Sequence, residues 1–539
     1  MESLFSNLET TVDINTFEVN VKLIEKNGTK YIHFQNLSSN QNLLNTLCEM
    51  LESDELYNKH HKIPLDILFN YHSQIKSKVE NGYYELFSLL DMLNNEYKNK
   101  IDAFDCMAKI GKISFSNITS LFNIGFKFVT EYNGKLFGGI VVSAKIDIDS
   151  FGNRYLRVST NIYYSHHNQI KIGSHSFVMS EFKGVKNINE LSIRPATDED
   201  IKLLTERGQK FVALATKVSY QSYNSSMYKQ TGYGKFNFNA KGRIMIDSKA
   251  FFQMNQNYNT GFGGSGKNVD VVLPEFYFMC SPTLYGFSLT TKQWGELYVD
   301  DVQDINFRED SFDKLVLDES RKKIIKALIV NNHLTFGDII EGKSGGCIFL
   351  LHGPPGVGKT LTCEAVSELL RKPLYNVGVG ELGTTVEVLE KKLSNIIEIA
   401  NSWDAIILID ECDIFMEQRS TNDVVRNAMV AIFLRLLERH QGVMFLTTNR
   451  IESMDEAFRS RISMILQYDN LTNETKSKVW SNLLLASNLS DCDINIDKLV
   501  EYTLNGRQIK SAIRMAQSIA LSEGVKVNTN ILENVIGYL

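Results

Sequence analysis

The sequence predicts an α/β protein with a parallel sheet and flanking helices in residues 305–469 and a helical lid in 470–539. An α+β and mainly antiparallel β region precedes them. From about Ser311 short apolar runs alternate with helical stretches, which is typical of parallel strands joined by crossover helices. Beyond residue 470 the apolar spacing is helical to the end. Residues 111–300 alternate instead and are rich in β-branched and aromatic residues, which indicates antiparallel strands.

The first part of the chain, residues 1–110, is predicted to be a separate α+β unit. Two alternating runs flank Asn27-Gly28, a dipeptide typical of a two-residue β-hairpin turn. Apolar residues spaced three and four apart then predict helices up to about residue 110. We therefore divide the chain into an α+β region at 1–110, a β-rich partner domain at 111–304, a large subdomain at 305–469 and a small helical subdomain at 470–539.

Composition limits the possible partners and compartments. The 539 residues include 57 Lys and Arg against 63 Asp and Glu, a net charge of −6, so nucleic acid is not an expected partner. The longest apolar runs fall far short of the ~20 residues of a membrane span, and the amino terminus lacks the apolar stretch of a secretory signal. Seven scattered cysteines without a C-x-x-C pair indicate reduced thiols, and we expect a cytoplasmic protein.

One motif carries most of the functional information. Residues 347–360 read "CIFLLHGPPGVGKT", in which a short buried strand leads into G-x-x-x-x-G-K-[ST], and an amphipathic helix follows. This order indicates a P-loop, whose backbone N–H groups surround a nucleotide phosphate at a helix N-terminus. Lys359 is predicted to reach the β- and γ-phosphates and Thr360 to ligate Mg²⁺. The predicted nucleotide-binding segment is Gly353, Pro354, Pro355, Gly356, Val357, Gly358, Lys359, Thr360 and Leu361.

Polar side chains follow two further apolar strands. "AIILIDECD" ends a predicted central strand at Asp410-Glu411, and "VMFLTTN" ends another at Asn449. Open α/β sheets bind ligands at the carboxyl ends of their strands, so these side chains are expected near the P-loop. We predict that Asp410 binds Mg²⁺ through water, that Glu411 is the general base for an attacking water, and that Asn449 orients that water.

A second stretch, "GFGGSGKN" at 261–268, fits part of the P-loop pattern but is rejected. Asn268 stands where a hydroxyl belongs, no strand pattern precedes the stretch, and no helical pattern follows it. We predict a Gly-rich loop between strands there, without nucleotide.

The motifs "LLHGPPGVGKTLT", "AIILIDECD", "FLTTNR" and "DEAFRSRI" together resemble the AAA clade of AAA+ ATPases. Three further segments resemble a group, common in fungi, whose AAA module follows a β-rich domain of unknown function: "GELGTT" (380–385), "FLRLLE" (433–438) and "NGRQIKSAI" (505–513). The resemblance is specific from about Gly242 to the end and does not cover residues 1–110. It implies an AAA+ P-loop core followed by a helical lid.

The resemblance also implies a homo-oligomeric ring, a hexamer, with ATP and Mg²⁺ at the subunit interfaces. Arg459 and Arg461 stand where the family places arginine fingers that contact a neighbour's γ-phosphate. The family often spaces them R-x-x-R, whereas this chain has R-x-R, so Arg461 is the first candidate and Arg459 the second. The alternative to arginine fingers is that both residues are solvated surface arginines that precede a strand. Arg507 in "NGRQI" resembles a sensor arginine that reaches the nucleotide from the lid.

Two stretches are candidates for contact with the adenine. Phe312 in "FDKLVL" is the first, and Asp338-Ile339 is the second. Apolar residues in these stretches could equally pack the domain core.

One departure from the family bears on mechanism. Peptide-threading AAA rings carry an aromatic-Gly pair in a loop after the P-loop helix, and the corresponding "NVGVGELGTTVEVLEKKL" has no such aromatic. Leu382-Gly383 is the nearest equivalent. This favours movement of cargo by domain displacement over threading.

We therefore predict an ATP-hydrolysing motor that remodels or translocates a protein or protein complex and binds protein cargo or an adaptor through residues 1–304. One alternative is an AAA+ machine that acts on nucleic acid, such as a loader, but the acidic charge and the absence of an Arg/Lys-rich helix argue against it. The other is a nucleotide-gated assembly scaffold that hydrolyses little, against which the complete set of acids argues. Salt-dependent nucleic-acid binding would distinguish the first, and turnover the second.

Overall fold

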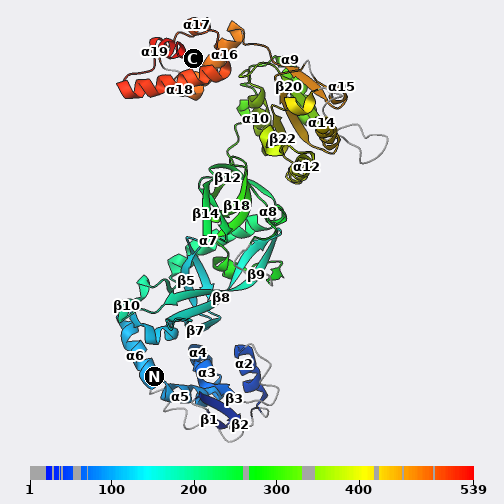
Figure 1. Ribbon diagram of the computed structural model, residues 1–539. Helices are drawn as coiled ribbons and strands as arrows, with labels where there is room; N and C mark the ends of the chain where they lie inside the picture. Colours follow the sequence, from blue (N-terminus) through cyan, green and yellow to red (C-terminus); the bar gives the residue numbers. More distant parts are fainter. Residues whose placement is uncertain are drawn as a thin grey trace.

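The computed structural model of the chain describes residues 20–26, 29–35, 37, 40–51, 62–69, 71–232, 234–258, 266–330, 346–417, 424–451, 454–489 and 492–539. Four units follow one another along an elongated molecule: the amino-terminal unit, the β region, the P-loop unit and the lid unit (Figure 1). Among the described helices, none combines the length and apolar character needed to cross a bilayer.

The amino-terminal unit is α+β, as predicted. Its elements are β1 (Asn20–Lys26), β2 (Thr29–Gln35), α2 (Gln41–Leu51), β3 (Lys62–Pro64), α3 (Leu65–Phe69), α4 (His72–Glu80), α5 (Phe87–Glu96) and α6 (Lys98–Lys109). Strands β1 and β2 form the predicted antiparallel pair, in which Lys26 is opposite Thr29. The predicted turn at residues 27 and 28 lies outside the described residues. Leucines of α2 and α5 pack with Ile32 and Phe34 of β2 in one core.

The β region is built from antiparallel strand pairs, as predicted. Its strands are β4 (Lys112–Ser114), β5 (Lys127–Tyr132), β6 (Lys135–Ile140), β7 (Ser143–Ile148), β8 (Arg154–His166), β9 (Gln169–Ser180), β10 (Val185–Asn187), β11 (Ile193–Pro195), β12 (Ser219–Tyr223), β13 (Ser226–Thr231), β14 (Gly234–Asn239), β15 (Gly242–Ile246), β16 (Lys267–Val269), β17 (Thr283–Ser288), β18 (Gln293–Tyr298) and β19 (Val302–Gln303). The largest sheet has the order β14-β13-β18-β17-β15-β12-β19, and a second has the order β16-β9-β8-β7. Lys267 begins a strand here and not a helix, which agrees with rejecting a second P-loop at 261–268.

A long helix interrupts the β region, and the sequence reasoning did not predict it. This helix is α7 (Asp198–Ala215), and the shorter α8 (Ser248–Met254) follows later in the region. Thr197 caps α7: its hydroxyl accepts the N–H of Asp200, whose carboxylate accepts the N–H of Thr197. This capping box, with acidic residues through the first turn, is a signal in the sequence that could have revealed the helix.

The P-loop unit holds a five-stranded parallel sheet in the order β21-β22-β23-β20-β24. Its strands are β20 (Cys347–His352), β21 (Leu374–Gly378), β22 (Ile406–Asp410), β23 (Val443–Thr448) and β24 (Met464–Gln467). Its helices are α9 (Glu319–Val330), α10 (Lys359–Leu370), α11 (Val379–Leu382), α12 (Val386–Ser402), α13 (Asp413–Met416), α14 (Val424–Leu437) and α15 (Glu456–Arg459). The central strands are buried on both faces, which explains their continuous apolar sequences.

The lid unit is helical, with α16 (Asn473–Ala486), α17 (Ile496–Leu499), α18 (Gly506–Glu523) and α19 (Thr529–Ile536). Its core centres on the fully buried Trp480 and on the apolar face of α18. The lid touches the P-loop directly, because the N–H of Gly506 donates to Gly356 O at 2.9 Å. The first turn of α18 therefore lies beside the phosphate-binding motif.

Candidate nucleotide-binding site

The P-loop motif forms a tight turn between β20 and α10 that requires its glycines. Gly356 and Gly358 have φ angles of 78° and 106°, in the left-handed region that L-residues with a Cβ disfavour. A Cβ on Gly353 would lie 2.1 Å from Tyr468 O, and one on Gly356 would lie 2.6 Å from Asn505 Oδ1. The backbone of the loop therefore packs against Tyr468, which follows β24, on one side and against the lid on the other. The N-terminus of α10 lies at the end of the loop.

The Lys359 side chain crosses this loop. Its Nζ donates to Gly353 O at 2.6 Å, to Pro354 O at 2.9 Å and to Asn449 Oδ1 at 2.8 Å. Lys359 is buried, and this burial lowers its pKa below the ordinary value, while the nearby Asp410 carboxylate opposes the shift. The ammonium thus connects the P-loop to the end of β23, where Asn449 lies.

The two predicted acids lie where β22 ends. Thr447 on the neighbouring strand β23 donates its hydroxyl hydrogen to Asp410 Oδ1. Glu411 follows with an exposed side chain and a φ of 56°, a left-handed conformation. Its N–H donates to Thr447 Oγ1 at 2.9 Å. One threonine therefore contacts both predicted acids.

Asn449 is held by the short helix that follows the acids. Its backbone N–H donates to Asp413 Oδ1 at 3.2 Å, and the Thr448 hydroxyl donates to the same oxygen. Asp413, the last residue of "DECD", thus connects the end of β22 to the end of β23. Sequence reasoning did not assign a role to Asp413, Thr447 or Thr448.

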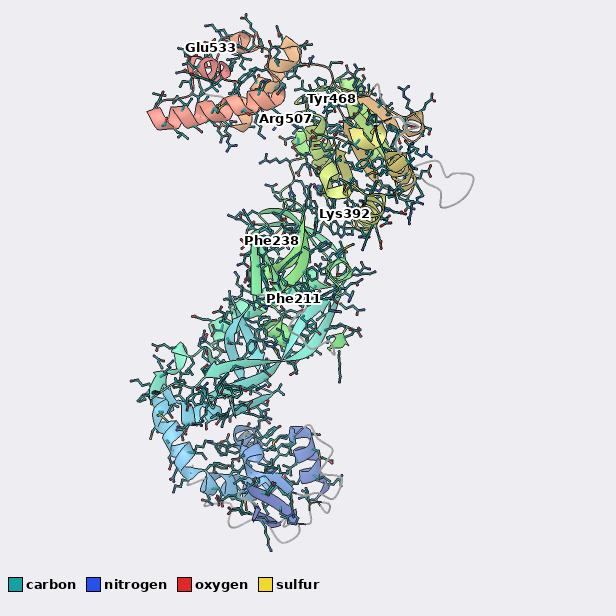
Figure 2. The ribbon with its side chains drawn as sticks, in the orientation of Figure 1. Phe211, Phe238, Lys392, Tyr468, Arg507 and Glu533 are labelled. Atoms are coloured by element: carbon teal, nitrogen blue, oxygen red, sulfur yellow. The ribbon has the colours of Figure 1, made fainter. Side chains whose placement is uncertain are left out.

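A cavity of about 550 Å³ lies over these residues, between the P-loop unit and the lid. Figure 2 shows Tyr468 on the P-loop unit and Arg507 on the lid, on either side of this junction; both line the cavity. The predicted site residues that line it are Pro355, Gly356, Val357, Gly358, Lys359, Thr360, Leu361, Asp410, Glu411, Asn449 and Arg507. Strands β22 and β23, the P-loop and the lid therefore all contribute to one cavity.

Of the predicted site residues that do not line the cavity, Gly353 and Pro354 lie in the P-loop, where their carbonyls accept hydrogen bonds from Lys359. The others lie elsewhere. Phe312 is 2% exposed and packs in the core of the P-loop unit, whereas Leu315, Val316 and Leu317 of the same stretch line the cavity. Asp338 and Ile339 lie outside the described residues. The aromatic ring of Phe312 is the largest apolar group in "FDKLVL". It packs in the core because burial of a large aromatic side chain contributes most to the stability of the fold.

Arg459 and Arg461 are not part of the cavity lining. Arg461 donates through Nε to Glu438 Oε1 at 2.8 Å and through a terminal nitrogen to Ala457 O at 2.8 Å. Arg459 is exposed and makes no hydrogen bond or ion pair with the part of the chain that the structure describes. Neither arginine therefore contributes to the cavity of its own chain.

The "GELGTT" segment differs from the expectation for a substrate-gripping loop. Leu382, the nearest equivalent of the missing aromatic, is 0% exposed and packs in the core with α12. Its neighbour Glu381 forms an ion pair with Lys292 of the β region, and its carbonyl accepts a hydrogen bond of 2.6 Å from Lys392. The Leu382 side chain therefore completes the core of the P-loop unit and is not exposed as a gripping residue would be.

Comparison with known proteins agrees with this architecture. Residues 349–470, from β20 past β24, match the family described as ATPase family associated with various cellular activities (AAA). The chain contains an AAA ATPase domain. Residues 104–200, before the AAA domain, match a domain of unknown function, DUF7025. The predicted AAA family is thus confirmed for the AAA domain. The predicted fold class is confirmed by the parallel sheet of that domain and by the antiparallel β region before it.

Named relatives share the AAA domain over part of their length. A 26S proteasome regulatory subunit homologue of Methanothermobacter marburgensis is 28% identical over 174 residues, which cover 30% of this chain and 46% of the relative. The AAA domain-containing protein FIGL1 of Arabidopsis thaliana is 27% identical over 226 residues, which cover 40% of this chain and 33% of the relative. The matched segments thus span less than half of each relative.

A solved structure also aligns with the chain. A chain from a structure titled "Structural Basis for Katanin Self-Assembly" covers 42% of this chain and 83% of its own length, at 19% identity and a TM-score of 0.33. That score is too low to support a conclusion about fold or function.

Proposed function

We propose that the chain hydrolyses ATP at this cavity and uses the free energy to remodel or translocate a protein or protein complex as an oligomeric ring. One observation carries the proposal: Lys359, Asn449 and the Asp410-Glu411 pair reach a single cavity from the P-loop and the ends of two neighbouring strands. This combination supplies a cation for phosphates, an amide to orient water and a carboxylate to accept a proton.

The donor groups beside the P-loop fit a magnesium ion. Thr360 offers a hydroxyl and Asp410 a carboxylate, the hard oxygen donors that Mg²⁺ prefers, and both line the cavity. In the described residues no cluster of three or more His, Cys, Asp or Glu could hold a metal by itself, so the ion would need phosphate oxygens and water as further ligands. When bound, it would neutralise charge on the phosphates.

The chain's own residues suggest how nucleotide binding prepares the reaction. Lys359 uses its three N–H groups on two loop carbonyls and on Asn449. Phosphate oxygens would compete for these donors, because a charge-assisted hydrogen bond to an anion is stronger than one to a neutral oxygen. The Asn449 amide would then be released to orient a water molecule, from which Glu411 would accept the proton.

Other residues are proposed to form the contacts of the ring and the surface that binds cargo. Arg461 and Arg459 are proposed to contact the γ-phosphate of a neighbouring subunit in a homo-hexamer, since neither lines the cavity of its own chain. Residues 1–304 are proposed to bind protein cargo or an adaptor. The buried Leu382 supports cargo movement without threading. A cytoplasmic location is supported by the seven cysteines, none of which forms a disulfide.

Substitution of the proposed base tests the hydrolysis step. Glu411→Gln is expected to bind ATP but not turn it over, because an amide cannot accept the proton, and Lys359→Ala is expected to lose nucleotide binding. Glu398→Gln removes an exposed carboxylate on α12, outside the cavity, and is the matched control. Phosphate release and binding of a fluorescent ATP analogue are measured for each variant. Turnover by Glu411→Gln at the wild-type rate would contradict the assignment of the base.

Trapping tests the remodelling role. Glu411→Gln protein loaded with ATP is expected to retain protein cargo on affinity purification from its native cells, and Lys359→Ala protein is expected to lose that cargo. If both variants retain the same proteins, the interaction does not depend on nucleotide and the motor proposal fails.

A further inference from the structure

The two predicted acids share one hydrogen-bonding partner, Thr447, to which the sequence motifs assigned no role. Thr447 lies on β23, beside the end of β22, and is 1% exposed. Its hydroxyl hydrogen is donated to Asp410 Oδ1, and its Oγ1 accepts the N–H of Glu411 at 2.9 Å. A hydroxyl has one hydrogen and two lone pairs, so Thr447 uses its single donor on the carboxylate and one acceptor site on the backbone.

The backbone of Glu411 has an unusual conformation that the hydrogen bond with Thr447 helps to hold. Glu411 has a φ of 56°, and a left-handed conformation is disfavoured for a residue with a Cβ. Such a conformation persists only where the surroundings hold it. Thr447 supplies two restraints, because its Oγ1 accepts the N–H of Glu411 and its carbonyl accepts the N–H of Cys412 at 3.0 Å. The direction in which the Glu411 side chain leaves the strand depends on this turn.

We propose that Thr447 is a positioning residue that orients both Asp410 and Glu411 for magnesium-dependent ATP hydrolysis. The inference rests on the function proposed above. Because the Thr447 hydroxyl donates to Asp410 Oδ1, the other carboxylate oxygen is left without this contact and would be available to help hold a magnesium ion. Because Thr447 Oγ1 accepts the Glu411 N–H, the left-handed turn directs the Glu411 carboxylate away from the sheet and towards the cavity.

The neighbouring threonine shows that the assignment is specific to Thr447. The Thr448 hydroxyl contacts Asp413 Oδ1 and the backbone of Arg450, and neither Asp410 nor Glu411. Thr447 therefore forms hydrogen bonds with the two acids. Thr448 and Asp413 instead form hydrogen bonds that hold the segment with Asn449.

The test compares two substitutions at one position in the full-length protein. Thr447→Val keeps the shape but removes the hydroxyl, and Thr447→Ser keeps the hydroxyl. Outer ligands of this kind typically affect metal affinity or activity by about 10–100-fold, so we expect Thr447→Val to lower kcat by roughly that factor with little change in KM for ATP. Thr447→Ser should recover most of the activity. Thr160→Val removes a hydroxyl from a fully buried threonine in the β region and is the control.

Binding measurements separate positioning from a general loss of structure. A fluorescent ATP analogue is titrated with and without Mg²⁺, and the thermal midpoint of the nucleotide-free protein is recorded. Thr447→Val is expected to bind the analogue normally without Mg²⁺. The Mg²⁺ concentration that gives half of the metal's effect on analogue binding is expected to rise about 10–100-fold. Its thermal midpoint should fall no further than that of Thr160→Val.

Each outcome has one interpretation. Wild-type kcat and Mg²⁺ dependence in Thr447→Val would overturn the inference alone and leave the ATPase proposal intact. Equal loss of kcat in Thr447→Val and Thr447→Ser would also overturn it, because the hydroxyl would then not be the active feature. A wild-type protein that binds nucleotide but releases no phosphate would overturn the proposed function, and the inference with it.

Discussion

The indole N–H of Trp403 donates a hydrogen bond of 2.9 Å to Asp247 Oδ2, and this bond joins the AAA domain to the β region. Trp403 is the C-cap residue that follows α12. Asp247 caps the N-terminus of α8, where its other oxygen accepts the N–H of Ala250 at 3.0 Å. Both side chains are buried, at 5% and 3% exposure. Around them Phe287 stacks on Tyr375 with ring centroids 5.4 Å apart. The two units therefore share one core.

A second contact links this interface to the nucleotide site. Helix α10 begins with Lys359 at the P-loop, and near its other end Glu368 accepts a hydrogen bond of 2.9 Å from Arg243 of β15. The N–H of Arg308 donates to the other oxygen of Glu368 at 2.8 Å. A displacement of α10 on phosphate binding would thus be transmitted to the β region through Glu368.

Trp403→Phe is expected to lower the stability of the interface. The substitution keeps an aromatic ring but leaves the buried Asp247 Oδ2 without its donor, which typically costs about 1–3 kcal/mol. The midpoint of thermal unfolding should fall accordingly. Trp294→Phe is the control, since Trp294 belongs to the same aromatic cluster and its indole donates no hydrogen bond to the described residues. Equal losses in both variants would show that ring packing alone holds the interface.

Arg461→Ala is expected to abolish most ATP turnover. Its subunits should still regain some turnover when they are mixed with subunits that carry an intact Arg461. An arginine supplied in trans contributes roughly 10³–10⁵ in rate in well-studied nucleotide hydrolases. Arg461 is held by Glu438, so less entropy is lost when it meets a phosphate than for the unrestrained Arg459. Mixing Arg461→Ala with Glu411→Gln subunits should restore some phosphate release, because intact interfaces form between them.

Two results would contradict this arrangement. A larger loss of turnover in Arg459→Ala than in Arg461→Ala would reverse the order of the two arginines. Specific activity that stays constant over a wide dilution series, with monomers seen by light scattering, would exclude a ring.

Leu382→Ala is expected to destabilise the AAA domain and not to weaken a grip on cargo. Replacement of a fully buried leucine by alanine typically costs about 2–5 kcal/mol, because a cavity remains in the core. The thermal midpoint should fall clearly below that of Leu485→Ala, which shortens an exposed leucine on the lid. A normal midpoint combined with lost cargo processing would show that Leu382 contacts cargo in an opened state of the segment.

The sequence by itself determined the AAA domain and the identity of its candidate site residues. A strand, a glycine-rich loop and a helix follow one another, and two later apolar strands end in Asp410-Glu411 and Asn449. These patterns are local, so a single sequence is enough to recognise them. The hairpin at Asn27-Gly28 was equally local. Helix α7 was missed although its cap is also local, because the surrounding β pattern dominated the interpretation.

Only the tertiary structure decided which apolar side chains belong to the core and which to the site. Phe312 and Leu382 lie within motifs, yet both are buried, because burial depends on which distant strands and helices pack against a segment. The contacts Trp403–Asp247 and Thr447–Asp410 join residues 156 and 37 positions apart. Such pairs depend on how the sheets and helices pack together, and no periodicity in one sequence specifies that packing.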